Sequence, residues 1–112
     1  MLLFTKKREK AIKMGNYHFL LTIPAEYKED FVKKLCKITN VVYAEGVRSD
    51  FFFMWTKRSI VLISVSKRVR ADGTLEVSIK GDEHDAFDVF LLIRENTDKE
   101  KVKIVNVWRF GM

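Results

Sequence analysis

Two apolar runs constrain the fold of this chain more than any other feature of its sequence. The first is Phe51-Phe52-Phe53-Met54-Trp55 and the second covers residues 59–65. Short runs without polar alternation are typical of strands that are buried on both faces. The two runs therefore predict neighbouring strands in the middle of a sheet that helices cover.

The other predicted elements complete an α+β fold. Residues 17–23 alternate as a strand does, and Pro24 favours the first turn of a helix. Apolar residues then recur at helical spacing and predict a helix over residues 25–38. Further strands are predicted over residues 41–45, 74–80, 87–93 and 102–108. One early helix followed by clustered strands indicates a mixed, mostly antiparallel sheet of about five or six strands, with one main helix packed on one face.

The length of 112 residues predicts one folded unit, preceded by a short basic segment. Met14-Gly15-Asn16 separates residues 1–15, an arm or short helix, from a single domain over residues 16–112. No apolar run approaches the length of a membrane span, and the first residues lack the order of a secretion signal. We therefore expect an intracellular, cytoplasmic protein. The absence of glutamine, with abundant lysine and glutamate, is typical of a thermophile.

The sequence lacks the common motifs that bind a metal ion or a nucleotide cofactor. Its single cysteine, Cys36, excludes an intrachain disulfide and a zinc site built on paired cysteines. The five glycines are too scattered for either common phosphate-binding loop. We expect no cofactor on these grounds.

Positive charge is concentrated in the segment that joins two predicted strands. The chain carries 21 Lys and Arg against 15 Asp and Glu, and residues 56–80 hold six of the former against two of the latter. Cations along a β-hairpin gain affinity for a polyanion by releasing its counterions, and Trp55 and Trp108 offer surfaces on which bases stack. The pattern predicts a nucleic-acid-binding domain that acts through the 57–80 hairpin. The predicted contacts are Lys57, Arg58, Lys67, Arg68, Arg70 and Lys80.

The turn of this hairpin, Ala71-Asp72-Gly73, determines which side chains share a face. A three-residue loop with Gly73 in the left-handed conformation places Val65 opposite Ile79, Val69 opposite Leu75 and Arg68 opposite Glu76. This register also places Lys67 opposite Val77, on the apolar face. A lysine there must reach water, find an anion or lower its pKa.

The order of elements resembles that of the PD-(D/E)xK nuclease superfamily at two positions. A helix precedes Asp50 at the start of one apolar strand, and a second strand ends in Val65-Ser66-Lys67. The resemblance implies Asp50 and Lys67 as catalytic residues, with Mg²⁺ as the cofactor of a nuclease. The acid expected two residues before the lysine is replaced by Val65, so Glu45 or Glu76 would have to take its place. The resemblance therefore implies a degenerate or inactive member.

A third hypothesis is a protein-interaction module without a nucleic-acid role. A small sheet leaves edge strands that pair with a second copy or with another protein. The basic segment 56–80 and the acidic segment 81–100 also complement one another between subunits. The predicted partners are therefore nucleic acid, a second copy of the chain or another protein.

Overall fold

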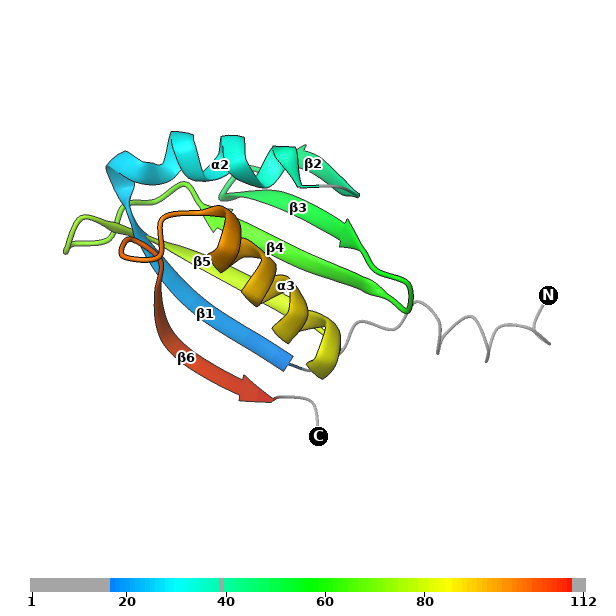
Figure 1. Cartoon of the computed structure of the whole chain (residues 1–112). Helices are drawn as coiled ribbons and strands as arrows, with labels where there is room; N and C mark the ends of the chain where they lie inside the picture. The colour runs from blue at the N-terminus through cyan, green and yellow to red at the C-terminus, as the bar shows by residue number, and fades with distance from the viewer. Residues whose placement is uncertain (1–16, 39, 110–112) are drawn as a thin grey trace.

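The chain folds into a six-stranded antiparallel sheet with two helices on one of its faces (Figure 1). The structure is a computed structural model that describes residues 17–38 and 40–109. The predicted arm, residues 1–15, lies outside the described residues. The elements are β1 (Tyr17–Pro24), the 3-10 turn η2 (Ala25–Tyr27), α2 (Lys28–Lys37), β2 (Val41–Glu45), β3 (Ser49–Trp55), β4 (Ile60–Ser66), β5 (Thr74–Gly81), α3 (Glu83–Asn96) and β6 (Lys103–Arg109).

The strands lie in the order β2-β3-β4-β5-β1-β6. Strands β2 to β5 follow one another as hairpins, whereas β1 is inserted between β5 and β6. Helix α2 carries the chain from β1 to the far edge of the sheet, and α3 carries it from β5 to β6 (Figure 1). The predicted α+β class, strand number and main helix are confirmed. Every pairing is antiparallel, and α3 is a second long helix.

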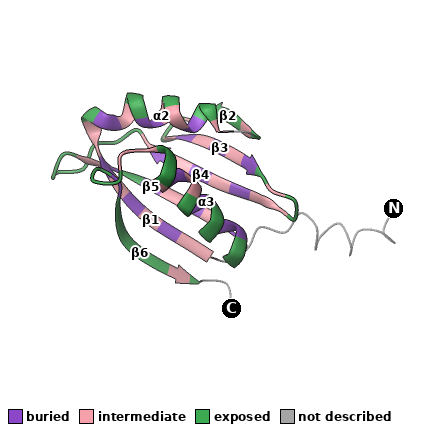
Figure 2. Ribbon diagram, viewed as in Figure 1, coloured by how far each residue is buried: buried purple, intermediate pink, exposed green. Residues whose placement is uncertain are grey.

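The core lies between the sheet and the two helices (Figure 2). Every second residue of β1, β3, β4 and β5 is buried, and α2 and α3 bury the apolar stripes that face the sheet. Each fully buried Leu, Ile or Phe contributes about 1.5–3 kcal/mol, so this layer stabilises the fold. Its members include Phe19, Leu21, Phe31, Leu35, Phe52, Val61, Ile63, Val77, Ile79, Phe90 and Ile93.

The prediction that the apolar runs are buried on both faces is wrong. Phe52 and Met54 are buried, but Phe51 and Phe53 are half-buried and Trp55 is exposed. Both helices pack on the same face of the sheet (Figure 2). The alternate strand residues therefore point to the other face, which no helix or strand of the described residues covers. We call this uncovered side the open face.

The predicted strand over residues 87–93 is also wrong, because these residues lie within α3. The Asp82 side chain caps the helix by accepting a hydrogen bond from the His84 N–H at 3.2 Å. Glu83 and Asp85 in the first turn complement the helix dipole. The acidic residues of this segment therefore begin a helix and do not form a loop.

The predicted register of the β4–β5 hairpin is wrong by two residues. Val65 pairs with Val77 and Ile63 pairs with Ile79, so residues 67–73 form a loop and not a continuation of the strands. A shift of two residues leaves every side chain on its predicted face. The left-handed Gly73, at φ 83°, is confirmed.

None of the described helices has the length and apolar content that crossing a membrane requires.

Candidate functional site

The six cations predicted to bind nucleic acid lie in three separate places. Lys57 and Arg58 occupy the β3–β4 turn, whereas Lys67, Arg68 and Arg70 belong to the β4–β5 loop. Strand β4 separates these two groups, and its seven residues span about 20 Å. Lys80 lies on β5, where it is paired with Leu62. The six side chains therefore do not form one continuous row.

Arg58 forms an ion pair with Asp85 of α3. Its guanidinium lies 2.7 Å from Asp85 Oδ1, and the hydroxyls of Thr56 and Ser59 donate to Asp85 Oδ2. Burial alone raises the pKa of Asp85, but the hydrogen bonds from Ser59, Arg58 and Thr56 outweigh it and lower the pKa. This cluster connects the β3–β4 turn to the start of α3, and Asp85 already neutralises the charge of Arg58.

Arg70 is likewise paired, while Arg68 is not. The Arg70 guanidinium lies 3.6 Å from Glu76 and 4.0 Å from Asp72. The predicted partner of Glu76 was Arg68, but Arg70 takes its place because the strands end before residue 67. The Arg68 side chain makes no ion pair with the described residues, and its main-chain N–H and C=O bond to the Ser66 hydroxyl.

The structure brings together the two residues predicted to be catalytic. Lys67 Nζ lies 3.8 Å from Asp50 Oδ1 and 2.9 Å from Glu45 Oε2. Glu45 stands directly opposite Asp50 in the β2–β3 register, whereas Glu76 lies on the open face. The hydrogen bond to Glu45 raises the pKa of Lys67. Lys67 has therefore found an anion, which was one of its predicted outcomes.

The surroundings of Asp50 do not fit the magnesium ion that the nuclease resemblance implies. The buried Asp50 carboxylate accepts a hydrogen bond from the Tyr43 hydroxyl at 3.2 Å and lies 3.3 Å from Lys28 Nζ. Two ammonium groups beside one carboxylate disfavour a divalent cation. Within residues 17–38 and 40–109, no three His, Cys, Asp or Glu side chains gather closely enough to hold a metal ion. This cluster joins β2, β3, α2 and the β4–β5 loop as an ion-pair network.

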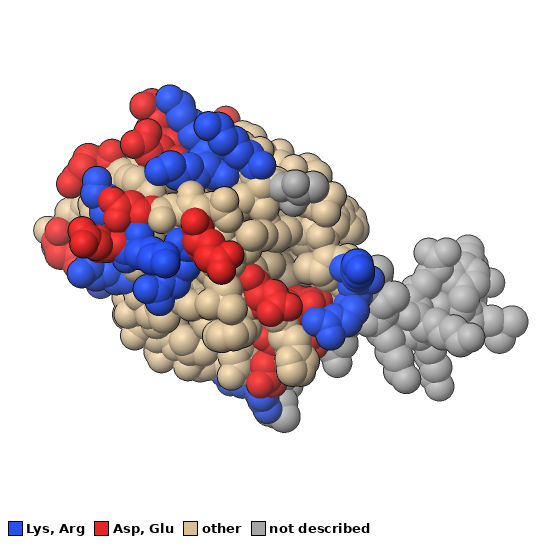
Figure 3. Space-filling model, viewed as in Figure 1, with Lys and Arg blue, Asp and Glu red and all other residues tan. Residues whose placement is uncertain are grey.

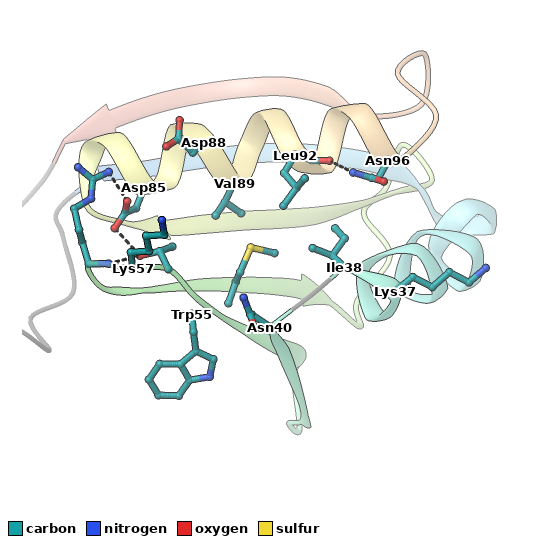
Figure 4. Close-up of a pocket in the computed structure, with 13 residues that line it drawn as sticks. Lys37, Ile38, Asn40, Trp55, Lys57, Asp85, Asp88, Val89, Leu92 and Asn96 are labelled. Atoms are coloured by element: carbon teal, nitrogen blue, oxygen red, sulfur yellow. Dashed lines mark hydrogen bonds and ion pairs between the residues drawn. The ribbon is translucent and has the colours of Figure 1, made fainter.

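A cavity of about 740 Å³ lies between the two helices (Figure 4). Val89 and Leu92 point into it from α3 (Figure 4), and Met54 lines it from β3. The Trp55 ring points away from it (Figure 4). Lys37, Lys57, Asp88, Asn40 and Asn96 line it at different points. The cavity has apolar walls, and the charged groups that lie together in it, Arg58 and Asp85, are already paired with one another.

The open face presents ordered rows of side chains across the whole sheet. Directly opposed residues of paired strands point to the same side, so the registers define each row. One row crosses all six strands, with ring side chains near both ends and Lys80 near its middle. It consists of Val42, Phe53, Leu62, Lys80, His18 and Trp108. The next row consists of Ala44, Phe51, Ser64, Ser78, Leu20 and Asn106.

Charge is distributed unequally between the two sides of the sheet. Among the described strand positions of the open face, Glu76 is the sole carboxylate, and Arg70 pairs with it. On the helix side, acidic and basic side chains lie next to one another over α2, α3 and the adjoining loops (Figure 3). The rings of His18 and Trp108 lie 4.1 Å apart on the open face. Burial, and then the nearby Lys80, lower the pKa of His18.

Sequence reasoning missed this face because Phe51 and Phe53 were expected to be covered. A signal for it was present in β4, where Ser64 and Ser66 alternate with Ile63 and Val65. Polar residues at every second position indicate an uncovered side. Comparison of the chain with protein-family models, curated proteins and solved structures finds no significant match.

Proposed function

We propose that the chain binds single-stranded nucleic acid on the open face of its sheet. The observation that carries the proposal is the arrangement of aromatic side chains and Lys80 on this surface. Its described strand positions hold one carboxylate, Glu76, which Arg70 already pairs. Phe51 and Phe53 project from one strand at a spacing of about 6–7 Å. Unpaired bases stack on aromatic side chains presented in this way by an uncovered sheet.

The electrostatics of the face support a polyanion as its partner. Lys80 stands between Leu62 and His18, and Lys103 lies at the β6 edge opposite Thr22. Arg68, at the end of β4, has no ion pair among the described residues and is available to a phosphate. Arg58, Lys67 and Arg70 are engaged in ion pairs. The proposal thus retains Lys80 and Arg68 from the predicted contacts and adds Phe51 and Phe53 of β3.

Fluorescence anisotropy with a labelled single-stranded DNA or RNA oligonucleotide tests this proposal. We expect Lys80→Glu to weaken binding at least about tenfold, because it reverses a charge within the contact surface. Lys33→Glu is the matched control. Lys33 is exposed on α2, on the other side of the sheet, and the same change of charge should alter binding by less than about threefold. Affinity should also fall steeply as salt is raised.

A second variant separates stacking from charge. Phe53→Leu keeps the side chain apolar, preserves the net charge and should weaken binding about fivefold or more. Circular dichroism would verify that each variant folds. Equal affinities for Lys80→Glu and Lys33→Glu, or no binding of either oligonucleotide by the wild-type chain, would overturn the proposal.

Nuclease activity is a second candidate, favoured by the single observation that Lys67 lies 3.8 Å from Asp50. Because two lysines already neutralise Asp50, we expect no Mg²⁺-dependent or Mn²⁺-dependent cleavage of plasmid DNA above the metal-free control. Agarose gel electrophoresis of DNA incubated with the chain checks this expectation. Metal-dependent cleavage that disappears in Asp50→Asn would instead establish a nuclease.

A further inference from the structure

The sheet extends beyond its helix layer at β6 and leaves an apolar surface there. Ile104 and Val107 point to the side on which the helices pack, because they stand opposite the buried Leu21 and Phe19. They are nevertheless 48% and 39% exposed. Phe87 and Leu91, on α3, are 47% and 40% exposed. We call these four side chains the β6 shelf. The Phe87 ring lies 6.3 Å from that of Phe19, which stands opposite Val107, so the helix and strand members of the shelf border the same core residue. Exposed apolar side chains grouped in this way mark interaction surfaces.

Strand β6 is also an open edge of the sheet. Its inner side pairs with β1, and its outer side has no strand partner among the described residues. The N–H of Val107 donates to the Asn106 side chain at 2.8 Å. A bulge at Val105 brings Ile104 and Val107, three residues apart, onto the same side. The open edge and the apolar shelf are therefore continuous.

We infer that the β6 shelf binds a second copy of this chain, with the two β6 strands antiparallel about a two-fold axis. The sequence of β6 complements itself in this arrangement. With Ile104 opposite the partner's Val107, apolar side chains meet on the helix side, and Lys103 stands opposite the partner's Trp108 on the open face. A lysine over an indole is a favourable contact.

The charges around β6 also complement one another about such an axis. The strand begins near Lys101 and Lys103 and ends beside the start of α3, where Asp82 and Glu83 lie. The Arg109 guanidinium is already paired with Glu83 at 2.6 Å. An antiparallel arrangement brings the basic beginning of one strand to the acidic neighbourhood at the end of the other. Like charges therefore do not oppose this association.

The opposite edge of the sheet, β2, also exposes apolar side chains, but it is shorter and more covered. It has five residues against seven in β6, and α2 packs over its inner side. Val42 on β2 is 53% exposed, which makes it a matched control for an exposed apolar residue on an edge strand.

Pairing through β6 would join two sheets into one of twelve strands with both open faces on the same side. The inference itself does not depend on nucleic-acid binding.

Sedimentation equilibrium over a range of concentrations up to about 200 μM, with NaCl raised in parallel samples, tests the inference. We expect a wild-type dimer that persists at high salt, since its contacts are largely apolar. Val107→Lys and Leu91→Lys should each raise the dimer dissociation constant at least about tenfold. Val42→Lys should leave it within about twofold. Leu91 is on a helix surface, so that variant remains informative if Val107→Lys fails to fold.

Two results would overturn the inference. The first is a wild-type chain that is monomeric at every concentration. The second is a dimer that Val42→Lys dissociates while Leu91→Lys leaves it intact. The latter result would assign the interface to the β2 edge.

Discussion

Asp85 shows how one buried carboxylate joins two distant segments. It is 3% exposed, and its oxygens accept hydrogen bonds from Thr56, Arg58 and Ser59, which lie 26–29 residues earlier in the chain. A buried carboxylate is tolerated only when it is paired and hydrogen-bonded. The position of the β3–β4 turn over α3 therefore depends on this side chain.

Replacing Asp85 with alanine should destabilise the fold by about 2–4 kcal/mol, because three donors lose their acceptor in a partly desolvated site. Urea denaturation followed by circular dichroism measures the loss. Asp88→Ala is the control, since Asp88 is exposed on the same helix and should change stability by less than about 0.5 kcal/mol. Similar losses for the two variants would contradict a structural role for the cluster.

Sequence reasoning predicted some individual residues better than others. Strand alternation predicted Lys67 on the apolar face with an anion as one of three outcomes. The structure places Lys67 in the β4–β5 loop, and Glu45 of β2 supplies the anion. The approach of Lys67 to Asp50 was expected only from the nuclease resemblance, which no finding tests. The Asp85 cluster was not predictable, since no local pattern indicates that a turn near residue 57 touches a helix near residue 85.

At the scale of elements, residues 86–93 show where hydrophobic periodicity fails to predict secondary structure, and residues 25–38 show where it succeeds. Residues 86–93 are mostly apolar, so their pattern suits a buried strand as well as a helix. The distinguishing signal was Asp82 followed by acidic residues, which is typical of a helix N-terminus. The helix over residues 25–38 was predicted because polar and apolar residues alternate there with a clear helical period. The structure divides that segment into η2 and α2.

The β4–β5 hairpin shows why faces are easier to predict than registers. Side chains alternate with a period of two, so any error of two residues preserves the face. The loop length depends on turn contacts. Here the Gly73 N–H donates to the Arg70 carbonyl, and the Arg70 N–H donates to the Thr74 carbonyl. The register error therefore changed the predicted positions of Arg68 and Arg70, which lie in a loop and not on a strand.

For the molecule as a whole, the placement of both helices on one side of the sheet determines which surface is available. The sequence indicated strands and helices but not which face each helix would cover. Apolar residues on both sides of β3 suggested a two-sided core. The topology instead places both helices on one face. Aliphatic residues predominate on that covered face, whereas serines, aromatic side chains and Lys80 lie on the open face.

Stability should decline in two stages as the pH falls. His18 has a pKa below its usual 6.5 in the folded chain, so the unfolded chain binds the proton more readily and stability falls as the pH drops below about 6.5. Asp85 has a pKa below its usual 3.8 in the folded chain, so its contribution is fully present above that value and is lost as the pH falls from 3.8 through the lower pKa of the folded state. Urea midpoints measured from pH 8 to about pH 3 should show both stages. His18→Asn should remove the upper stage alone, and an unchanged upper stage would refute its assignment to His18.

The position of β1 between β5 and β6 has a consequence for how the chain acquires its structure. Strand β1 pairs only with strands that are synthesised much later than itself, because its partners β5 and β6 begin at residues 74 and 103. Contacts that distant in sequence carry a high cost in loop closure and slow the search for the native state. Until residues 74–81 have been synthesised, the apolar side of β1 has no strand to pair with, and such exposed apolar surface favours aggregation or chaperone binding.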